Sequence, residues 1–113
     1  MIQGDVCWHT FREPDKRRPV LILTNNELIP QLTQVTVAQI TRTVRGSDSE
    51  VLLGTFDGMV DECAVNLTNI KTVEKSKISR AVITNLSRER MREVREAIEF
   101  VFDFDKLHSD AAE

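Results

Sequence analysis

Apolar residues recur at helical spacing in one segment, close to the end of the chain. Ser87 precedes this segment as a suitable N-cap, and Glu89 lies in its first turn, where a carboxylate favours the helix dipole. The apolar stripe is formed by Met91, Val94, Ile98, Val101 and Phe102. Most of the preceding chain consists of short strand-like runs separated by turns. A series of strands followed by one terminal helix indicates an α+β fold.

The strongest strand signal covers residues 33–44, TQVTVAQITRTV, which are rich in β-branched side chains. Residues 19–23, PVLIL, form a continuously apolar run that is typical of a central strand. The other strand-like segments are residues 4–11, 50–54 and 63–75, the last being one or two strands. Residues 78–86 have no pattern that assigns them to a strand or a helix. We therefore expect about five mostly antiparallel strands in a curled sheet, followed by the helix.

The length of 113 residues predicts a single domain over residues 1–113, with an acidic tail that frays from about residue 105. The net charge is −3, but six of the 18 acidic residues lie from Glu96 onward, with one of the 15 basic residues. The body of the chain is therefore mildly basic, which permits a local phosphate site. No apolar run approaches the roughly 18 residues of a membrane span. The N-terminus has no basic region followed by an apolar one, so we expect no secretory signal. We expect a cytoplasmic protein.

The few cysteines and histidines restrict the possible chemistry. Cys7 and Cys63 are too few and too far apart for a disulfide scaffold, so we expect two free thiols in the core, in a reducing compartment. His9 and His108 form no pair with metal-ligand spacing, and no carboxylate cluster is evident. We therefore expect no metal and no other cofactor. Trp8, the only tryptophan, is expected in the core.

Two arginines and a threonine are the best candidates for chemistry. Arg17 and Arg18 directly precede Pro19 and its buried strand, and Thr41 ends the strongest strand segment. In an antiparallel sheet the start of one strand can lie beside the end of its neighbour. An arginine fork matches a phosphate, and a threonine hydroxyl adds a donor or acceptor. From spacing alone, both a phosphate site and ordinary surface charges at a strand end remain open.

A resemblance to a known family narrows this choice. The segments GDVCW, RRPVLIL, VTVAQITRTVRG, NLTNIKTVEKSKI and LSRERMREV occur, over residues 4–104, in the order and spacing of the family. In this respect the chain resembles the MazF/PemK toxins. The resemblance implies a small SH3-like barrel with a C-terminal helix, a homodimer, and sequence-specific cleavage of single-stranded RNA. It also implies a cognate antitoxin as partner, and Arg18 and Thr41 as the catalytic residues.

The chain departs from the family pattern in two places. Family members commonly carry a longer loop with a Gly-Ser-Glu-Gln stretch before the Arg-Pro-Val strand, whereas this chain has the shorter REPDKR. Glu13 is therefore the residue to which a role for that glutamate would be assigned, but the motif around it is absent. The family also often has an acid-glutamine pair, implied to read bases, where this chain has Thr68-Asn69. The resemblance thus implies Asn69 as an RNA contact, with a different sequence preference.

The mechanism expected for such a site uses a nucleophile that RNA itself supplies. Its 2′-hydroxyl lies next to the scissile phosphate, so the enzyme has to align the attack and stabilise charge on the phosphoryl oxygens. Arg18 is assigned to charge stabilisation, because a guanidinium with a pKa above about 12 is a poor base. Glu13, Asp15 and His9 remain candidates for the general base, and we expect His9 to be a half-exposed strand histidine. Arg17 is a candidate contact to the RNA backbone.

A non-catalytic toxin or interaction module with the same barrel is the alternative. The resemblance extends to gyrase-poisoning toxins, which share the barrel and act through C-terminal residues that include a tryptophan. This chain ends in HSDAAE, and its only tryptophan is Trp8. The sequence therefore favours an endoribonuclease, and a ribonuclease assay without metal separates the two.

Overall fold

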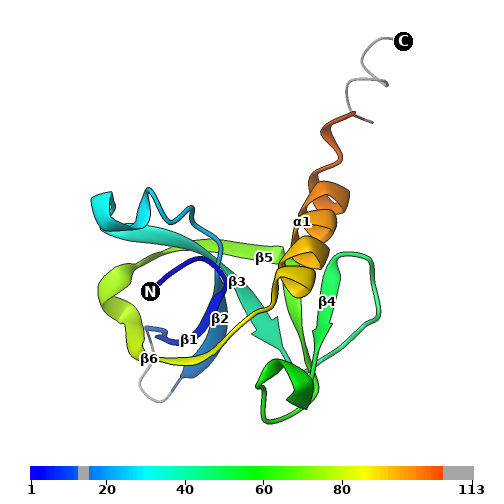
Figure 1. The fold of residues 1–113 in the computed structure, drawn as a ribbon, viewed down its shortest axis with the longest axis horizontal. Coiled ribbons are helices and arrows are strands. Elements are labelled where there is room, and N and C mark those ends of the chain that lie inside the picture. Colours follow the sequence, from blue (N-terminus) through cyan, green and yellow to red (C-terminus); the bar gives the residue numbers. More distant parts are fainter. Residues whose placement is uncertain (13–15, 106–113) are drawn as a thin grey trace.

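The computed structural model describes residues 1–12 and 16–105, which form a six-stranded antiparallel sheet followed by one α-helix (Figure 1). The strands are β1 (Asp5–Thr10), β2 (Arg17–Ile22), β3 (Gln34–Thr41), β4 (Glu50–Leu53), β5 (Cys63–Glu74) and β6 (Ile78–Asn85), and the helix is α1 (Arg88–Phe102). Their order in the sheet is β4-β5-β3-β2-β1-β6. This architecture confirms the predicted α+β fold on a curled sheet.

The sheet contains one strand more than the sequence predicted. Residues 78–86, which no pattern assigned, supply the edge strand β6, which pairs with β1 alone. Its register with β1 shifts twice, and several of its side chains are exposed. An irregular, partly exposed edge strand has no clean apolar alternation, which is why the sequence did not identify residues 78–86 as a strand.

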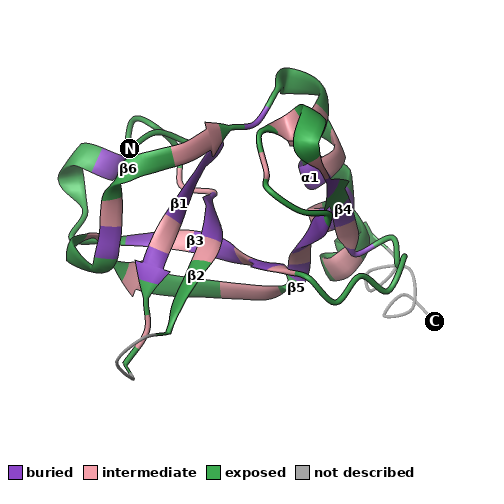
Figure 2. Cartoon of the chain, turned by 90° about the horizontal axis from the view of Figure 1, so that it is seen from below, coloured by how far each residue is buried: buried purple, intermediate pink, exposed green. Residues whose placement is uncertain are grey.

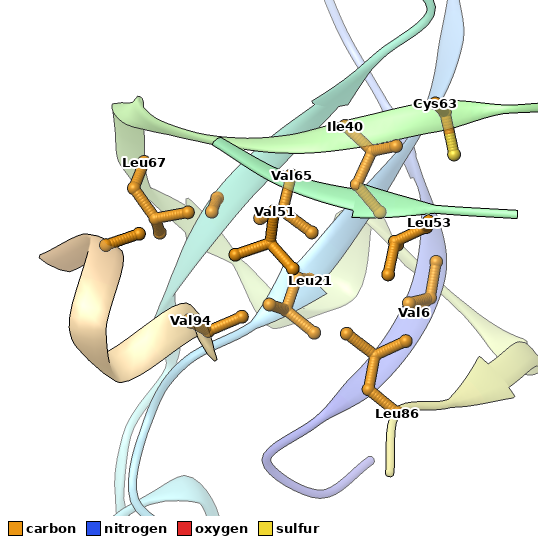
Figure 3. Close-up of a cluster of buried hydrophobic side chains, with 12 residues drawn as sticks. Val6, Leu21, Ile40, Val51, Leu53, Cys63, Val65, Leu67, Leu86 and Val94 are labelled. Carbon is orange, nitrogen blue, oxygen red and sulfur yellow. The ribbon is translucent and has the colours of Figure 1, made fainter. Parts of the chain in front are cut away.

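Both faces of the central strands are buried. One face packs against β4, β5 and α1 in a cluster that Figure 3 shows in close-up, and that includes Val6, Leu21, Ile40, Val65 and Val94. The opposite face forms a second cluster, which includes Cys7, Val20, Ile22, Val37 and Ile78. Figure 2 shows the resulting buried positions along β1, β3 and β5. Burial on both faces explains why PVLIL is apolar throughout rather than alternating.

The helix begins where the sequence predicted. Ser87 Oγ accepts a hydrogen bond from the backbone N–H of Arg90 at 3.1 Å, which makes it the N-cap. The predicted stripe contacts the core, except at its end. Phe102 is half exposed and stacks on Phe104 with ring centroids 5.7 Å apart, so its assignment to the buried stripe was wrong. Figure 1 shows the reason, because the last turn of α1 extends beyond the sheet.

The Gly-Asp pair at the start of β1 joins the N-terminal segment to the last strand. Gly4 has a φ of +92°, a conformation that favours glycine. The buried Asp5 carboxylate accepts hydrogen bonds from the Ile2 backbone N–H and from Asn85 Nδ2, both at 2.9 Å. These bonds tie the start of β1 to the end of β6. In the described part of the chain, no helix has the length and apolar character needed to cross a bilayer.

Candidate active site

Arg18 and Thr41 lie at the same end of two paired strands. In the β2–β3 ladder, Val20 lies opposite Gln39. Arg18 is two residues before Val20, and Thr41 is two residues beyond Gln39. Residues two apart on a strand share a face, so Arg18 and Thr41 lie on the same side of the sheet. The structure thus places the two predicted catalytic residues at one end and on one face of a rigid strand pair.

His9 belongs to this same face. It lies directly opposite Arg18 in the β1–β2 ladder, and paired residues of neighbouring strands share a face. We call the side of the sheet that carries His9, Arg18, Gln39 and Thr41 the Arg18 face. The His9 side chain is not half exposed as expected, since the residue is 6 % exposed. Its ring packs edge-on against Phe11, with centroids 4.4 Å apart, and this contact contributes to its burial.

The Arg18 face is concave. Lys71 lies on β5 opposite Val37, and therefore on the same face as Gln39 and Thr41. In the sheet order, β3 and β2 separate β5 from β1, a span of roughly 14 Å in a flat sheet. Nevertheless Lys71 Nζ lies 5.4 Å from the centre of the Phe11 ring, directly after β1. The sheet therefore curls around this face and brings a distant cation to the neighbourhood of His9.

An amide pair lies beside the strand end. Asn69 Nδ2 donates a hydrogen bond to Gln39 Oε1 at 2.9 Å. Asn69 reaches Gln39 because β5 bulges here: Ala38 pairs with Ile70 and Gln39 with Asn66, which leaves residues 67–69 without partners on β3. The structure thus brings Asn69 to the Arg18 face. Sequence reasoning did not include Gln39 in the site, although its alternation with Thr41 was a usable signal.

Arg17 lies on the opposite face. It pairs with Thr10, and its guanidinium carbon lies 5.2 Å from the centre of the Trp8 ring, a cation–π contact. Trp8 is half-buried under this contact rather than enclosed in the core, so its predicted core position was wrong. The structure does not bring Arg17 together with Arg18 and Thr41, because adjacent residues of a strand point to opposite sides.

Titration at the Arg18 face is dominated by burial and by cations. Burial lowers the pKa of His9, and the positive charges of Lys71 and Lys77 lower it further. The imidazole is therefore neutral at pH 7. Burial likewise raises the pKa of Cys7 and Cys63, the two free buried thiols, which are therefore poor nucleophiles. Glu13, Asp15 and His108 lie outside the described residues.

This combination of groups suits a polyanion. A guanidinium can pair with phosphoryl oxygens, a hydroxyl can donate one more hydrogen bond, and a neutral imidazole can accept a proton. The two polar amides beside them offer donors and acceptors to a base. Over residues 1–12 and 16–105, no cluster of three or more His, Cys, Asp or Glu side chains could hold a metal ion.

Known proteins share the sequence and the architecture. The family of PemK-like, MazF-like toxins of type II toxin-antitoxin systems matches residues 2–102. Endoribonuclease MazF3 of Mycobacterium tuberculosis is 40% identical over 91 residues, which cover 80% of this chain and 87% of the relative. The structure of the Mycobacterium tuberculosis toxin MazF-mt6 is similar with a TM-score of 0.79 and 36% identity, covering 88% of this chain and 96% of the toxin.

A mycobacterial endoribonuclease solved in complex with its cognate antitoxin has the same fold, with a TM-score of 0.81 at 21% identity, covering 92% of this chain and 96% of that chain. The family match spans nearly the whole chain, and it agrees with the curled sheet and terminal helix. The chain therefore belongs to the family of PemK-like, MazF-like toxins of type II toxin-antitoxin systems.

Proposed function

We propose that this chain is the toxin of a type II toxin-antitoxin system and acts as a sequence-specific endoribonuclease on single-stranded RNA. The observation that supports the proposal is the register of β2 and β3, in which Arg18 and Thr41 each lie two residues beyond the Val20–Gln39 pair, on one face of the sheet. Family membership supports the same activity, since MazF3, a relative of this chain, is named an endoribonuclease. The proposed compartment is the cytoplasm, where mRNA is found.

The proposed reaction is an internal phosphoryl transfer. The 2′-oxygen of the substrate attacks the adjacent phosphorus, the bond to the 5′-oxygen breaks, and the products carry a 2′,3′-cyclic phosphate and a 5′-hydroxyl. Arg18 stabilises the negative charge that develops on the phosphoryl oxygens, and the Thr41 hydroxyl donates to one of them. RNA supplies the nucleophile, so the reaction does not require a metal-bound hydroxide.

Base recognition is assigned to the amide pair. Gln39 and Asn69 share one hydrogen bond, which leaves further amide donors and acceptors for the edge of a base. We do not include Arg17 in the proposed site, since it stacks on Trp8 across the sheet from Arg18.

The proposed partners are a second copy of the chain and an antitoxin. Family membership supports an antitoxin, and an acidic, partly disordered segment would compete with RNA for the cations of the Arg18 face. We also expect a symmetric homodimer. A stoichiometric antitoxin complex that cleaves RNA as fast as the free protein would contradict the first point. Sedimentation at micromolar concentration as a monomer would contradict the second.

The experiment that tests the function is a cleavage assay with purified protein and a chelator such as EDTA. The substrates are a single-stranded RNA that the protein cuts, and the same RNA with one 2′-methoxy sugar at the scissile step. We expect the unmodified RNA to give a 2′,3′-cyclic phosphate, identified by mass spectrometry, and the modified RNA to remain intact. Cleavage of the 2′-methoxy substrate would refute the mechanism, and no cleavage of any RNA would favour a non-catalytic toxin.

A further inference from the structure

One titratable side chain at the Arg18 face has no assigned role in the reaction proposed above. His9 lies across the β1–β2 ladder from Arg18, so the Cβ atoms of the two residues are about 5 Å apart by the geometry of antiparallel pairs. The imidazole is held between the strands and the Phe11 ring, and the residue is 6 % exposed. A group that is fixed this firmly beside the proposed phosphate site can act on the substrate without first being ordered.

The ring nitrogens of His9 are not engaged elsewhere. Nδ1 is buried and has no hydrogen-bond partner among the described residues. Nε2 forms no hydrogen bond to a described residue either, but it is not fully enclosed. Buried polar atoms are nearly always satisfied, so an orphaned ring nitrogen needs an explanation, and a reactive role is one of the recognised ones. Because no partner fixes the tautomer, the neutral ring can present a bare Nε2 to a ligand.

Burial keeps His9 neutral, and the described charged groups that face it are all cations. They come from Arg18 on β2, Lys71 on β5, and Lys77 in the short 3₁₀ turn before β6, and all three are positive. Burial and the two lysines lower the pKa of His9. A base must be unprotonated before it accepts a proton, and a base that lacks a carboxylate partner releases the proton readily afterwards.

We propose that His9 is the general base of the RNA cleavage reaction, and this inference rests on the endoribonuclease function proposed above. Nε2 of the neutral imidazole accepts the proton of the attacking 2′-hydroxyl as the 2′-oxygen bonds to phosphorus. The bond from phosphorus to the 5′-oxygen breaks, and that oxygen takes a proton from water. The imidazolium then returns its proton to solvent. In this mechanism Arg18 supplies a permanent positive charge, and His9 transfers the proton.

The pH dependence of cleavage tests this assignment. For the wild-type protein, kcat/KM should fall tenfold for each pH unit below the pKa of His9, which lies under its ordinary value of 6.5. His9→Gln retains a polar side chain and should lose about a hundred- to ten-thousandfold in kcat/KM at pH 7.5, the usual contribution of a general base. The acid limb should disappear in this variant between pH 5 and 6.5.

The second histidine of the chain provides the matched control. His108→Gln should retain both the rate and the acid limb of the wild-type protein. This variant also leaves His9 as the only imidazole in an NMR titration, because the chain contains two histidines. The pKa measured for that ring in the free protein should equal the kinetic pKa of kcat/KM.

A substrate with sulfur in place of the 5′-bridging oxygen separates a base from an acid. Sulfur is a good leaving group that needs no proton, so the loss in His9→Gln should persist if His9 is the base. If His9→Gln cleaved the sulfur-containing substrate as fast as the wild-type protein, the proposal would be overturned. An acid limb that is unchanged in the variant, or a variant activity above a tenth of wild type, would also overturn it. If His9→Gln fails to fold, as judged by thermal unfolding, the NMR and kinetic pKa values in His108→Gln are compared instead. Agreement between them supports the proposal, and disagreement overturns it. A wild-type protein that cleaves no RNA would instead refute the proposed function.

Discussion

Arg90 donates a hydrogen bond from Nε to Asp57 Oδ1 at 2.9 Å, and this contact fastens α1 to the turn between β4 and β5. The same carboxylate accepts from the backbone N–H of Gly54 at 2.9 Å, and Arg90 Nη1 donates to Glu93 Oε2 at 2.8 Å. The Asp57 side chain is 10 % exposed, so water screens the pair only weakly. Loss of one partner would leave the other poorly solvated.

Replacing this carboxylate should destabilise the protein. We expect Asp57→Ala to lower the free energy of unfolding by about 1–3 kcal/mol, the usual cost of leaving buried hydrogen-bonding groups without a partner. Urea unfolding followed by circular dichroism measures the change. The matched control is Glu99→Gln, which removes the exposed Arg95–Glu99 pair at 3.2 Å and should cost less than about 0.5 kcal/mol. Equal effects would show that the Asp57 contact contributes no more than a surface pair.

The contribution of Asp57 should depend on pH. Burial alone raises the pKa of Asp57, but the hydrogen bonds from Arg90 and Gly54 outweigh it, and the pKa is lowered overall. A carboxyl with a lowered pKa stabilises the fold fully above its unfolded pKa of about 3.9, and this contribution is lost as pH falls through the folded value. The stability difference between wild type and Asp57→Asn should therefore shrink below about pH 4. A difference that stays constant from pH 6 to pH 2.5 would contradict this linkage.

Glycine is required at one turn for two separate reasons. Gly58 has a φ of +88°, and a Cβ added there would lie 2.5 Å from Thr84 Oγ1. Gly46 has a φ of +74° with nothing within 4 Å, whereas Gly54 has neither a positive φ nor a close neighbour. We expect Gly46→Ala to cost about 1–2 kcal/mol and Gly58→Ala clearly more, while Gly54→Ala stays near neutral. Thermal unfolding of the three variants measures this order. Equal stability losses in Gly58→Ala and Gly46→Ala would show that a clash with Thr84 contributes nothing.

The two neighbouring arginines should differ in their effect on cleavage. Arg18→Ala should lower kcat by about a hundred- to a thousandfold, the usual loss when a transition-state donor is removed. Arg18→Lys should recover little, because an ammonium does not reproduce the bidentate fork. Arg17→Ala removes the same charge from the opposite face, so single-turnover assays should show a loss below about tenfold. Comparable losses in both alanine variants would mean that charge alone, rather than its placement, determines the rate.

The hydroxyl of Thr41 can be tested separately from its shape. Thr41→Val keeps the β-branched side chain at the end of β3 and removes the donor. We expect slower cleavage with little change in the unfolding temperature, because the backbone N–H of Thr43, which donates to Thr41 Oγ1 at 3.0 Å, is exposed and can donate to water in the variant. A rate equal to wild type would remove Thr41 from the proposed catalytic residues.

The sequence predicted the secondary structure well where burial produces a simple pattern. The buried runs that became β2 and β3, and the capped helix after Ser87, follow from local preferences alone. The placement of Arg18 and Thr41 at the same end of β2 and β3 was also predictable, because it needs only that neighbouring strands run antiparallel.

The rest of the site depends on contacts that no local pattern encodes. Lys71 reaches Phe11 only because the sheet curls across two intervening strands, and this curl is a property of the whole sheet. Asn69 meets Gln39 only because β5 shifts register between them. The burial of His9 likewise depends on the Phe11 ring that packs against it. Each of these features joins residues whose distance in space is set by tertiary structure.

The register shift in β5 also separates two roles that one stretch of a strand usually combines, pairing with its neighbour and presenting side chains to a ligand. Pairing with β3 holds on both sides of the shift, at Ala38 and at Gln39, while residues 67–69 have no partner on β3. Leu67 anchors this segment in the core, which leaves Thr68 and Asn69 as positions that the ladder does not constrain. Evolution can therefore vary the side chains at these positions, of which we propose Asn69 for RNA contact, without moving the strand end that carries Thr41. A scaffold built in this way can acquire new RNA preferences while its cleavage chemistry stays constant.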